Sequence, residues 1–174
     1  MTRPPLPPAA PRIEEILTTL VRHGVDFVLV GGQAGIARGS SYPSFDVDVA
    51  YSRDSANIAR LVEALRDLGV RLRGASDLPF VLDETTIANG ANFTFASPSG
   101  DIDVLGDVAG ISSFADLRAR AERAEVGGVE VPVASIDDLI AMKRAANRPK
   151  DRLMLEEYLV IADEEQRAGR PDVG

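Results

Sequence analysis

The sequence has no cysteine and no tryptophan, and its only histidine is His23. Without cysteine, the chain can form neither disulfide bonds nor thiolate metal sites, which is compatible with a reducing cytoplasm. A single imidazole also excludes a metal site built from several histidines. These absences leave carboxylates as the candidate metal ligands.

Long hydrophobic runs are missing as well, since no apolar stretch approaches the length of a membrane span. The opening residues, MTRPPLPPAAPR, lack both the apolar centre of a signal peptide and an amphipathic pattern. We therefore expect no membrane partner and a cytoplasmic location.

Positive charge is scarce in this chain, which has a net charge of −8. An acidic chain is poorly suited to broad, nonspecific nucleic-acid binding, because such binding depends on basic surfaces. Both lysines of the sequence, Lys143 and Lys150, nevertheless lie in the short segment KRAANRPKDR together with three arginines. A charged helix face is usually only solvated, but this clustering favours a local basic site.

The chain has 174 residues and 45% hydrophobic content, which is enough for one well-filled core. Five prolines among residues 1–11 predict a disordered arm there. We expect a single domain over residues 12–165 and a flexible tail over residues 166–174.

Hydrophobic spacing and turn residues predict the order of the helices and strands. Helices are expected at residues 12–22, 33–38, 55–68, 113–122, 135–147 and 148–166, the last one fraying after Asp163. Strands are expected at residues 26–32, 45–52, 70–73, 80–82, 91–97 and 101–106, and as a pair around Gly127 and Gly128. Ser135, with Asp138 three residues later, predicts a capping box. The pattern indicates an α/β protein with a mixed, antiparallel-rich β-sheet flanked by helices.

Four aspartates occur within two of the predicted strands, FDVDVAYS and DIDVLG. Aspartate is uncommon in strands because its carboxylate is costly to desolvate without a partner. Since side chains alternate along a strand, Asp46 and Asp48 share one face, and Asp101 and Asp103 repeat the arrangement. Adjacent strands of this kind gather carboxylates that repel one another unless a cation, a proton or a basic residue compensates. We expect a divalent metal ion to be the compensating group.

A predicted strand ending in two glycines precedes the first aspartate pair. The segment VLVGG, thirteen intervening residues, DVD and a later IDVL occur in this order. The pattern resembles that of the DNA polymerase β-like nucleotidyltransferase superfamily. The closing segment, VPVASIDDLIAMKRAANRPKD, is similar to the tail of small bacterial members, including the AbiEii-type toxin nucleotidyltransferases. The resemblance covers residues 25–160.

The resemblance implies a nucleotidyltransferase fold and an enzyme that transfers a nucleoside monophosphate from an NTP, such as ATP, to an acceptor hydroxyl. It implies that Asp46, Asp48 and Asp103 hold Mg²⁺ or Mn²⁺, hard cations that prefer oxygen ligands. Asp101 competes for the third position, but it follows a turn glycine, whereas Asp103 is flanked as a strand interior should be.

Further residues receive nucleotide-binding roles from the same resemblance. Backbone amides at Gly31 and Gly32 can approach the phosphates because no side chain stands in the way. Lys143 is the candidate for neutralising developing phosphate charge, with Lys150 second. Ser44, in the loop before the first aspartate, is a candidate nucleotide contact. Without the aspartates, the two glycines would indicate only an ordinary turn from a strand into a helix.

Three other residues carry weaker signals. Relatives of the toxin type often have an arginine a few residues before the first aspartate, where this chain has Tyr42. A basic nucleotide contact is therefore missing or supplied from elsewhere. His23 is expected at a helix end, not as a catalytic base, and Asp151 is expected to pair with a lysine, to join the site, or to favour a helix start by its charge.

The expected partners are an NTP and an acceptor that the sequence does not identify: a transfer-RNA end, a protein or a small molecule. The toxin-like tail adds an antitoxin to the candidate partners. The alternative function is a noncatalytic protein of the same fold that binds a nucleotide or a partner. A third interpretation is a subunit whose site is completed by another chain.

Overall fold

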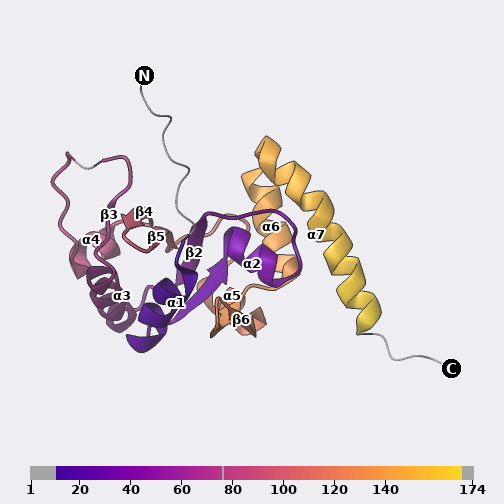
Figure 1. The fold of residues 1–174 in the computed structure, drawn as a ribbon, viewed down its shortest axis with the longest axis horizontal. Helices are drawn as coiled ribbons and strands as arrows, with labels where there is room; N and C mark the ends of the chain where they lie inside the picture. The colour runs from indigo at the N-terminus through magenta and orange to yellow at the C-terminus, as the bar shows by residue number, and fades with distance from the viewer. Residues whose placement is uncertain (1–10, 76, 170–174) are drawn as a thin grey trace, which may run out of the picture.

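The computed structural model describes residues 11–75 and 77–169, which form one β-sheet with helices packed around it (Figure 1). Within these residues the sheet has seven strands in the order β3-β4-β5-β2-β1-β7-β6. The strands are β1 (Phe27–Val30), β2 (Asp46–Tyr51), β3 (Arg71–Leu72), β4 (Asn92–Ser97), β5 (Gly100–Leu105), β6 (Glu122–Val126) and β7 (Val129–Val133). The helices are α1 (Ile13–Arg22), α2 (Gly31–Ala37), α3 (Ser55–Asp67), α4 (Glu84–Asn89), α5 (Phe114–Arg120), α6 (Ile136–Ala146) and α7 (Pro149–Ala168). The predicted arm, except Pro11, and the end of the predicted tail from residue 170 lie outside the described residues.

The sheet mixes parallel and antiparallel pairs. Strand β2 runs parallel to β5 and antiparallel to β1, and β1 runs parallel to β7. The pairs of β3 with β4, β4 with β5, and β6 with β7 are antiparallel. The predicted mixed, antiparallel-rich sheet flanked by helices is therefore confirmed.

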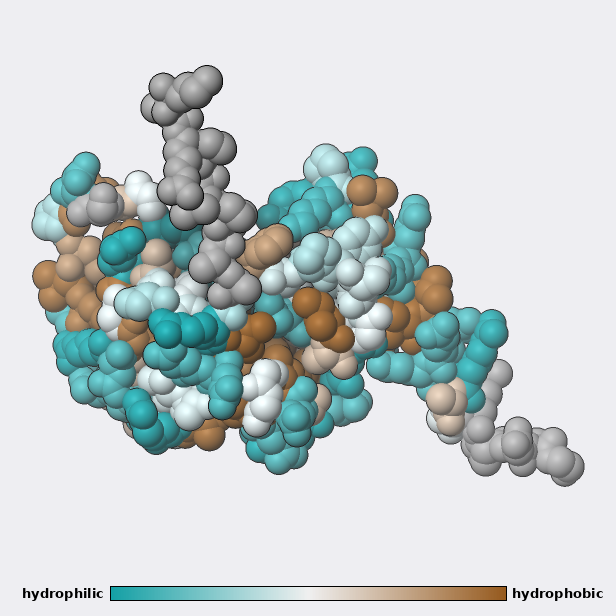
Figure 2. Space-filling view, viewed as in Figure 1, coloured by the Kyte–Doolittle hydropathy of each residue, from teal (hydrophilic) through white to brown (hydrophobic). Residues whose placement is uncertain are grey.

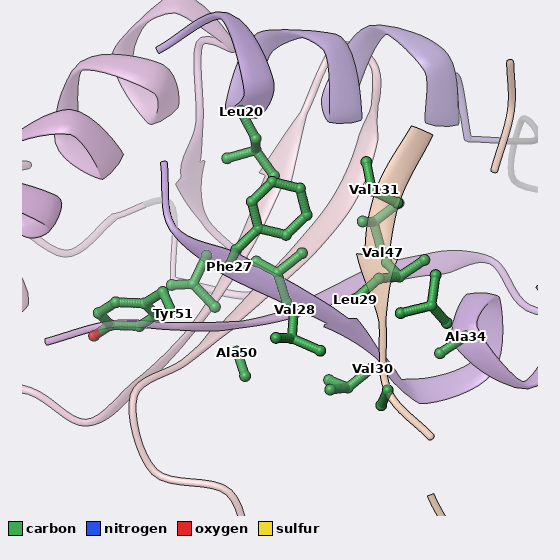
Figure 3. Packing of buried hydrophobic residues seen from close by; sticks show 14 of the residues in the cluster. Leu20, Phe27, Val28, Leu29, Val30, Ala34, Val47, Ala50, Tyr51 and Val131 are labelled. Carbon is green, nitrogen blue, oxygen red and sulfur yellow. The ribbon is translucent and has the colours of Figure 1, made fainter. Parts of the chain in front are cut away.

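Apolar residues alternate with the aspartates along β2 and β5. Val47, Val49, Ile102 and Val104 are completely buried in a core that also includes residues of β1, α1 and α3. Figure 3 shows part of this core around β1 and Val47. Because side chains alternate, burying this face turns the aspartates of both strands to the opposite face. The core therefore fixes where the acidic side chains lie.

Two predictions of local structure are wrong between β3 and β4. Residues 80–82 do not form a strand; the Phe80 ring packs against those of Phe93 and Phe95, with centroids 6.2 Å and 5.9 Å away. The short helix α4 was not predicted, although Asp83 caps it by accepting a hydrogen bond from the Thr86 amide at 2.7 Å. Apolar and aromatic residues favour a strand locally, but here Phe80 and Leu82 pack against the core from a loop and Val81 is exposed.

Helix α7 projects beyond the rest of the fold (Figure 1), and its last turns are hydrophilic (Figure 2). It continues to Ala168, beyond Asp163, and the fraying expected after Asp163 stays a prediction. An ion pair between Asp163 and Arg167, with 2.7 Å between its atoms, lies one turn apart on this segment and supports the helix. None of the helices in residues 11–75 and 77–169 combines the length and apolar composition needed to cross a membrane.

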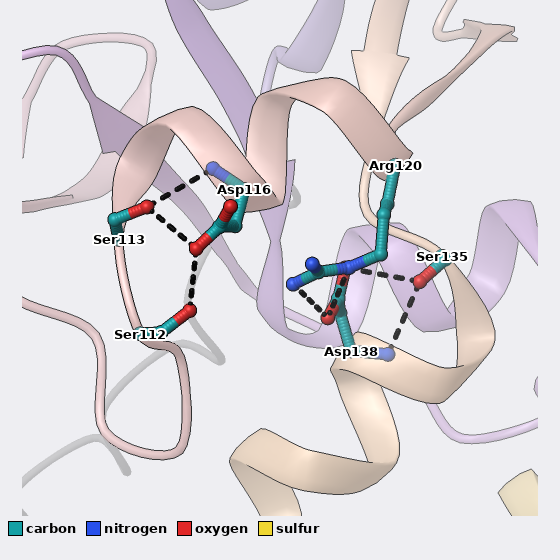
Figure 4. A network of polar contacts seen from close by, with 6 residues as sticks. All are labelled: Ser112, Ser113, Asp116, Arg120, Ser135 and Asp138. Carbon is teal, nitrogen blue, oxygen red and sulfur yellow. Dashed lines mark hydrogen bonds and ion pairs between the residues drawn. The ribbon is translucent and has the colours of Figure 1, made fainter.

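Helix α6 begins in a network of polar contacts that Figure 4 shows. The Ser135 hydroxyl accepts a hydrogen bond from the Asp138 amide at 3.1 Å, which confirms the predicted N-cap. The Asp138 carboxylate does not complete the predicted capping box, because it accepts hydrogen bonds from Arg120 at 2.8 to 3.1 Å. Asp138 therefore ties α6 to α5 and holds in place the helix that carries Lys143.

Candidate active site

Two parallel strands bring the four aspartates together. Strands β2 and β5 pair in a register that puts Asp46 beside Asp101 and Asp48 beside Asp103. Neighbouring residues in such a register share a face of the sheet, so the predicted gathering of carboxylates is confirmed. The Asp48 and Asp103 carboxyl groups are also hydrogen-bonded to each other. Asp103, rather than Asp101, is therefore the direct partner of Asp48.

The electrostatic consequence of this crowding appears in the pKa values. Burial raises the pKa of Asp48 to about 7, and repulsion by Asp103 and the hydrogen bond to it act in the same direction. Burial also raises the pKa of Asp46; Arg73 opposes this rise, and repulsion by Asp103 adds to it. Asp48 therefore carries a proton in part of the molecules near neutral pH.

A basic residue that the sequence did not single out lies against the acidic face. Arg73 follows the short edge strand β3, and its guanidinium group forms a hydrogen-bonded ion pair with Asp103. The same group lies 3.3 Å from an Asp101 oxygen and 3.9 Å from an Asp46 oxygen. The sequence did not point to Arg73, because its position depends on the order of strands in the sheet. Strand β3 lies beside β4, and β4 lies beside β5, which carries Asp103.

The carboxylates suit a divalent cation in their chemistry, but they are not placed as a ready ligand set. Oxygen donors from Asp46, Asp48 and Asp103 are those that Mg²⁺ and Mn²⁺ prefer. In residues 11–75 and 77–169, no three acidic or histidine side chains converge as the ligands of a metal ion. The guanidinium group of Arg73 instead holds Asp103, so binding of a cation there requires this ion pair to open.

The glycine turn after β1 lies directly against the acidic residues. Gly31 has a φ of +68°, and a Cβ atom there would lie 2.0 Å from Asp48 Oδ2. A Cβ atom on Gly32 would lie 2.5 Å from the Ser44 hydroxyl. Both positions therefore require glycine because neighbouring side chains approach the backbone closely. The glycines form the first turn of α2, two residues earlier than predicted.

The basic segment faces this acidic region from α6 and α7. Lys143 Nζ donates a hydrogen bond to Asp151 Oδ1 at 3.0 Å, and Arg148 Nε donates to Asp151 Oδ2 at 2.7 Å. Burial acts to raise the pKa of Asp151, but these hydrogen bonds outweigh it and lower that pKa to about 2. Asp151 is thus the lysine partner that the sequence suggested. It orients Lys143 while lying almost completely buried itself.

A cleft of about 620 Å³ joins these groups. Every residue predicted for the site lines it: Gly31, Gly32, Ser44, Asp46, Asp48, Asp103, Lys143 and Lys150. Its remaining walls are largely apolar and include Leu105, Val108 and Met142. The cleft therefore offers an acidic wall, a basic wall and an apolar surface between the sheet and the last two helices.

Of the residues with weaker sequence signals, His23 lies away from the cleft and Tyr42 lies in it. His23 ends α1, and its Nε2 lies 2.6 Å from Asp67 Oδ2, outside the residues that line the cleft. Tyr42 does line the cleft, and so does Arg148. The cleft therefore contains a basic side chain, Arg148, although position 42 is a tyrosine.

Substitution of Gly31 tests how tightly the glycine turn is packed against Asp48. Gly31→Ala introduces both a left-handed strain and a clash with Asp48, whereas Gly24→Ala, at a φ of +67°, meets only Arg60 Cδ at 3.6 Å. We expect each to lose about 1 kcal/mol of unfolding free energy from its backbone, and Gly31→Ala roughly 1 kcal/mol more. Urea unfolding followed by circular dichroism measures both values. Equal losses would contradict the close approach.

The depressed pKa of Asp151 predicts a stability that depends on pH. Because this pKa is about 2 in the folded protein and near 3.8 in the unfolded chain, the charged carboxylate contributes about 2 kcal/mol at pH 7. The contribution falls to about half by pH 3 and is lost as the pH drops through the folded value.

The difference in unfolding free energy between the wild type and Asp151→Asn, measured at several pH values, tests this expectation. Glu156→Gln, an exposed position on the same helix, serves as the control and should show no such change. A difference for Asp151→Asn that stays constant from pH 7 to pH 3 would show that the ion pair does not set the pKa.

No family model and no curated protein matches the chain, but solved structures do. The lincosamide antibiotic adenylyltransferase LnuA, solved with lincomycin bound, has a TM-score of 0.58 at 12% identity over 86% of this chain and 96% of its own. ANT(2″)-Ia in complex with adenylyl-2″-tobramycin has a TM-score of 0.52 at 16% identity over 90% and 97% of the two chains. A protein from Thermotoga maritima assigned as a nucleotidyltransferase has a TM-score of 0.53 at 14% identity over 84% and 89%. The narrower resemblance to AbiEii-type toxins stays a prediction, whereas these likenesses show that the chain has the nucleotidyltransferase fold.

Proposed function

We propose that this protein is a divalent-metal-dependent nucleotidyltransferase that transfers a nucleoside monophosphate from an NTP to an acceptor hydroxyl. One observation carries the proposal: a single cleft holds Asp46, Asp48 and Asp103 on one wall and Lys143 and Lys150 on the other. Carboxylates facing a basic group across a cleft fit a ligand that carries both metal ions and phosphates. The fold of antibiotic adenylyltransferases supports the same reading.

In this proposal the residues of the cleft divide the work of binding. Gly31 and Gly32 let the side chains of Asp48 and Ser44 pack against the turn after β1, which places this turn beside the triphosphate. Lys143, held by Asp151, faces the phosphates and stabilises the negative charge that develops there. A metal ion held by Asp46, Asp48 and Asp103 would supply further positive charge to the triphosphate.

The transfer itself is an in-line displacement at the α-phosphorus. The acceptor oxygen forms a bond to this phosphorus as the bond to the bridging oxygen breaks, and pyrophosphate leaves with the electron pair. The acceptor hydroxyl loses its proton to a carboxylate of the acidic wall or to solvent. The chain needs no further co-reactant for this step.

A small molecule is the acceptor that the cleft supports best. Its volume of about 620 Å³ lies in the range of small-molecule sites, and Leu105, Val108 and Met142 supply an apolar surface. The solved relatives are named for lincomycin and for an adenylylated tobramycin. A transfer-RNA end or a protein acceptor, and a toxin role with an antitoxin partner, rest on the sequence resemblance alone.

A noncatalytic nucleotide-binding protein is the second candidate function. Arg73 favours it, because its guanidinium group neutralises carboxylates that a metal ion would otherwise need. The two functions differ in one measurable product, since binding alone releases no pyrophosphate.

Replacing the central carboxylate distinguishes these functions. We expect Asp48→Asn to reduce label transfer from α-³²P-labelled NTPs at least roughly a hundredfold, because it removes a metal ligand. Acceptors to be supplied are aminoglycosides, lincosamides, transfer RNA and the protein itself. Asp137→Asn, an exposed position in the first turn of α6, removes the same charge outside the cleft and should keep the activity. Full transfer by Asp48→Asn would overturn the mechanism.

A further inference from the structure

Among the residues that the structure describes, Arg73 is the one that forms ion pairs with Asp46, Asp101 and Asp103. Its side chain reaches the acidic face from the edge of the sheet. It is held from behind by β4, because its amide donates to Thr94 O at 3.0 Å and its guanidinium group to Phe95 O at 3.2 Å. About a third of its side chain is exposed. The residue is therefore anchored both through its backbone and through its guanidinium group.

The contacts of Arg73 overlap with those that a metal ion would need. Asp103 and Asp46 belong to the proposed ligand set, whereas Asp101 does not, and Arg73 touches all three. A carboxylate oxygen that accepts a hydrogen bond from a guanidinium group cannot at the same time present that lone pair to a cation. Two positive groups at these distances also repel each other. Arg73 and a divalent cation therefore compete for Asp103.

We propose that Arg73 is the internal counter-ion of the acidic cluster, and that a divalent cation displaces it from Asp103 when it binds. Asp101 is the residue that would hold Arg73 after this displacement. Its carboxylate lies 3.3 Å from Arg73 Nε and outside the cleft-lining residues, so Arg73 keeps this partner after releasing Asp103. The second D-x-D pair thus has two roles: Asp103 serves the cation, and Asp101 serves the arginine.

The inference rests on the proposed function for the identity of the competing cation. The counter-ion role predicts that removing Arg73 strengthens metal binding. Damage to the fold would not have this effect. A residue whose role is only structural would leave the affinity unchanged or weaken it on substitution. Competition between Arg73 and the metal ion also makes the metal affinity of the wild type lower than the carboxylates alone would give.

The test is a titration of Mn²⁺ into the full chain without nucleotide, with free Mn²⁺ followed by electron paramagnetic resonance. We expect Arg73→Gln to bind Mn²⁺ about tenfold more tightly than the wild type, since the competing charge is gone. Arg71→Gln is the matched control. It removes the same charge from an exposed residue of β3 and should stay within about twofold of the wild type. Arg73→Lys, which keeps the charge but loses the planar group that reaches several carboxylates, should fall between the two.

The outcomes separate this inference from the proposed function. Tighter binding by Arg73→Gln alone supports displacement. Equal or weaker binding by Arg73→Gln, with Mn²⁺ still bound by the wild type, overturns the counter-ion role and leaves the proposed function intact. Absence of Mn²⁺ binding in the wild type and in all three variants overturns both. If Arg73→Gln does not fold, the comparison of Arg73→Lys with Arg71→Gln decides by the same criterion.

Discussion

Pairing β2 with β5 in parallel places Asp46 beside Asp101 and Asp48 beside Asp103, and the repulsion between these carboxylates must be offset by positive charge or by protons. In the structure both offsets are present. Burial and Asp103 raise the pKa of Asp48 to about 7, and Arg73 pairs with Asp103. In the proposed function, a bound cation would offset the same repulsion between the carboxylates.

The rest of the fold holds positive charge opposite this acidic wall. The Ser135 cap and the contact between Asp138 and Arg120 fix the start of α6, and Lys143 follows about two turns later on that helix. Asp151, at the start of α7, then orients Lys143 toward the cleft. Asp151 is a buried carboxylate with two cationic partners, and it thus links α6 and α7 beside the basic wall of the cleft.

Much of this could be predicted from local sequence signals. Alternation of valine and aspartate identified the two acidic strands, and paired glycines before DVD indicated the turn that now lies against Asp48. Arg73 could not be predicted, because its contact with Asp103 depends on the order of strands in the sheet. Residues 80–82 were misassigned for a related reason: the Phe80 ring packs on Phe93 and Phe95 of β4 from a loop, and local propensity does not specify the backbone conformation of such a contact.

In the proposed function, one cleft binds a nucleoside triphosphate through a cation held by the aspartates. The decisive experiment is calorimetric titration of each of the four NTPs with Mg²⁺ into the wild type and into Asp46→Ala/Asp48→Ala. We expect Mg²⁺-dependent binding of at least one NTP to the wild type and its loss in the double variant. Undiminished binding to the double variant, or no binding of any NTP to the wild type, would contradict it.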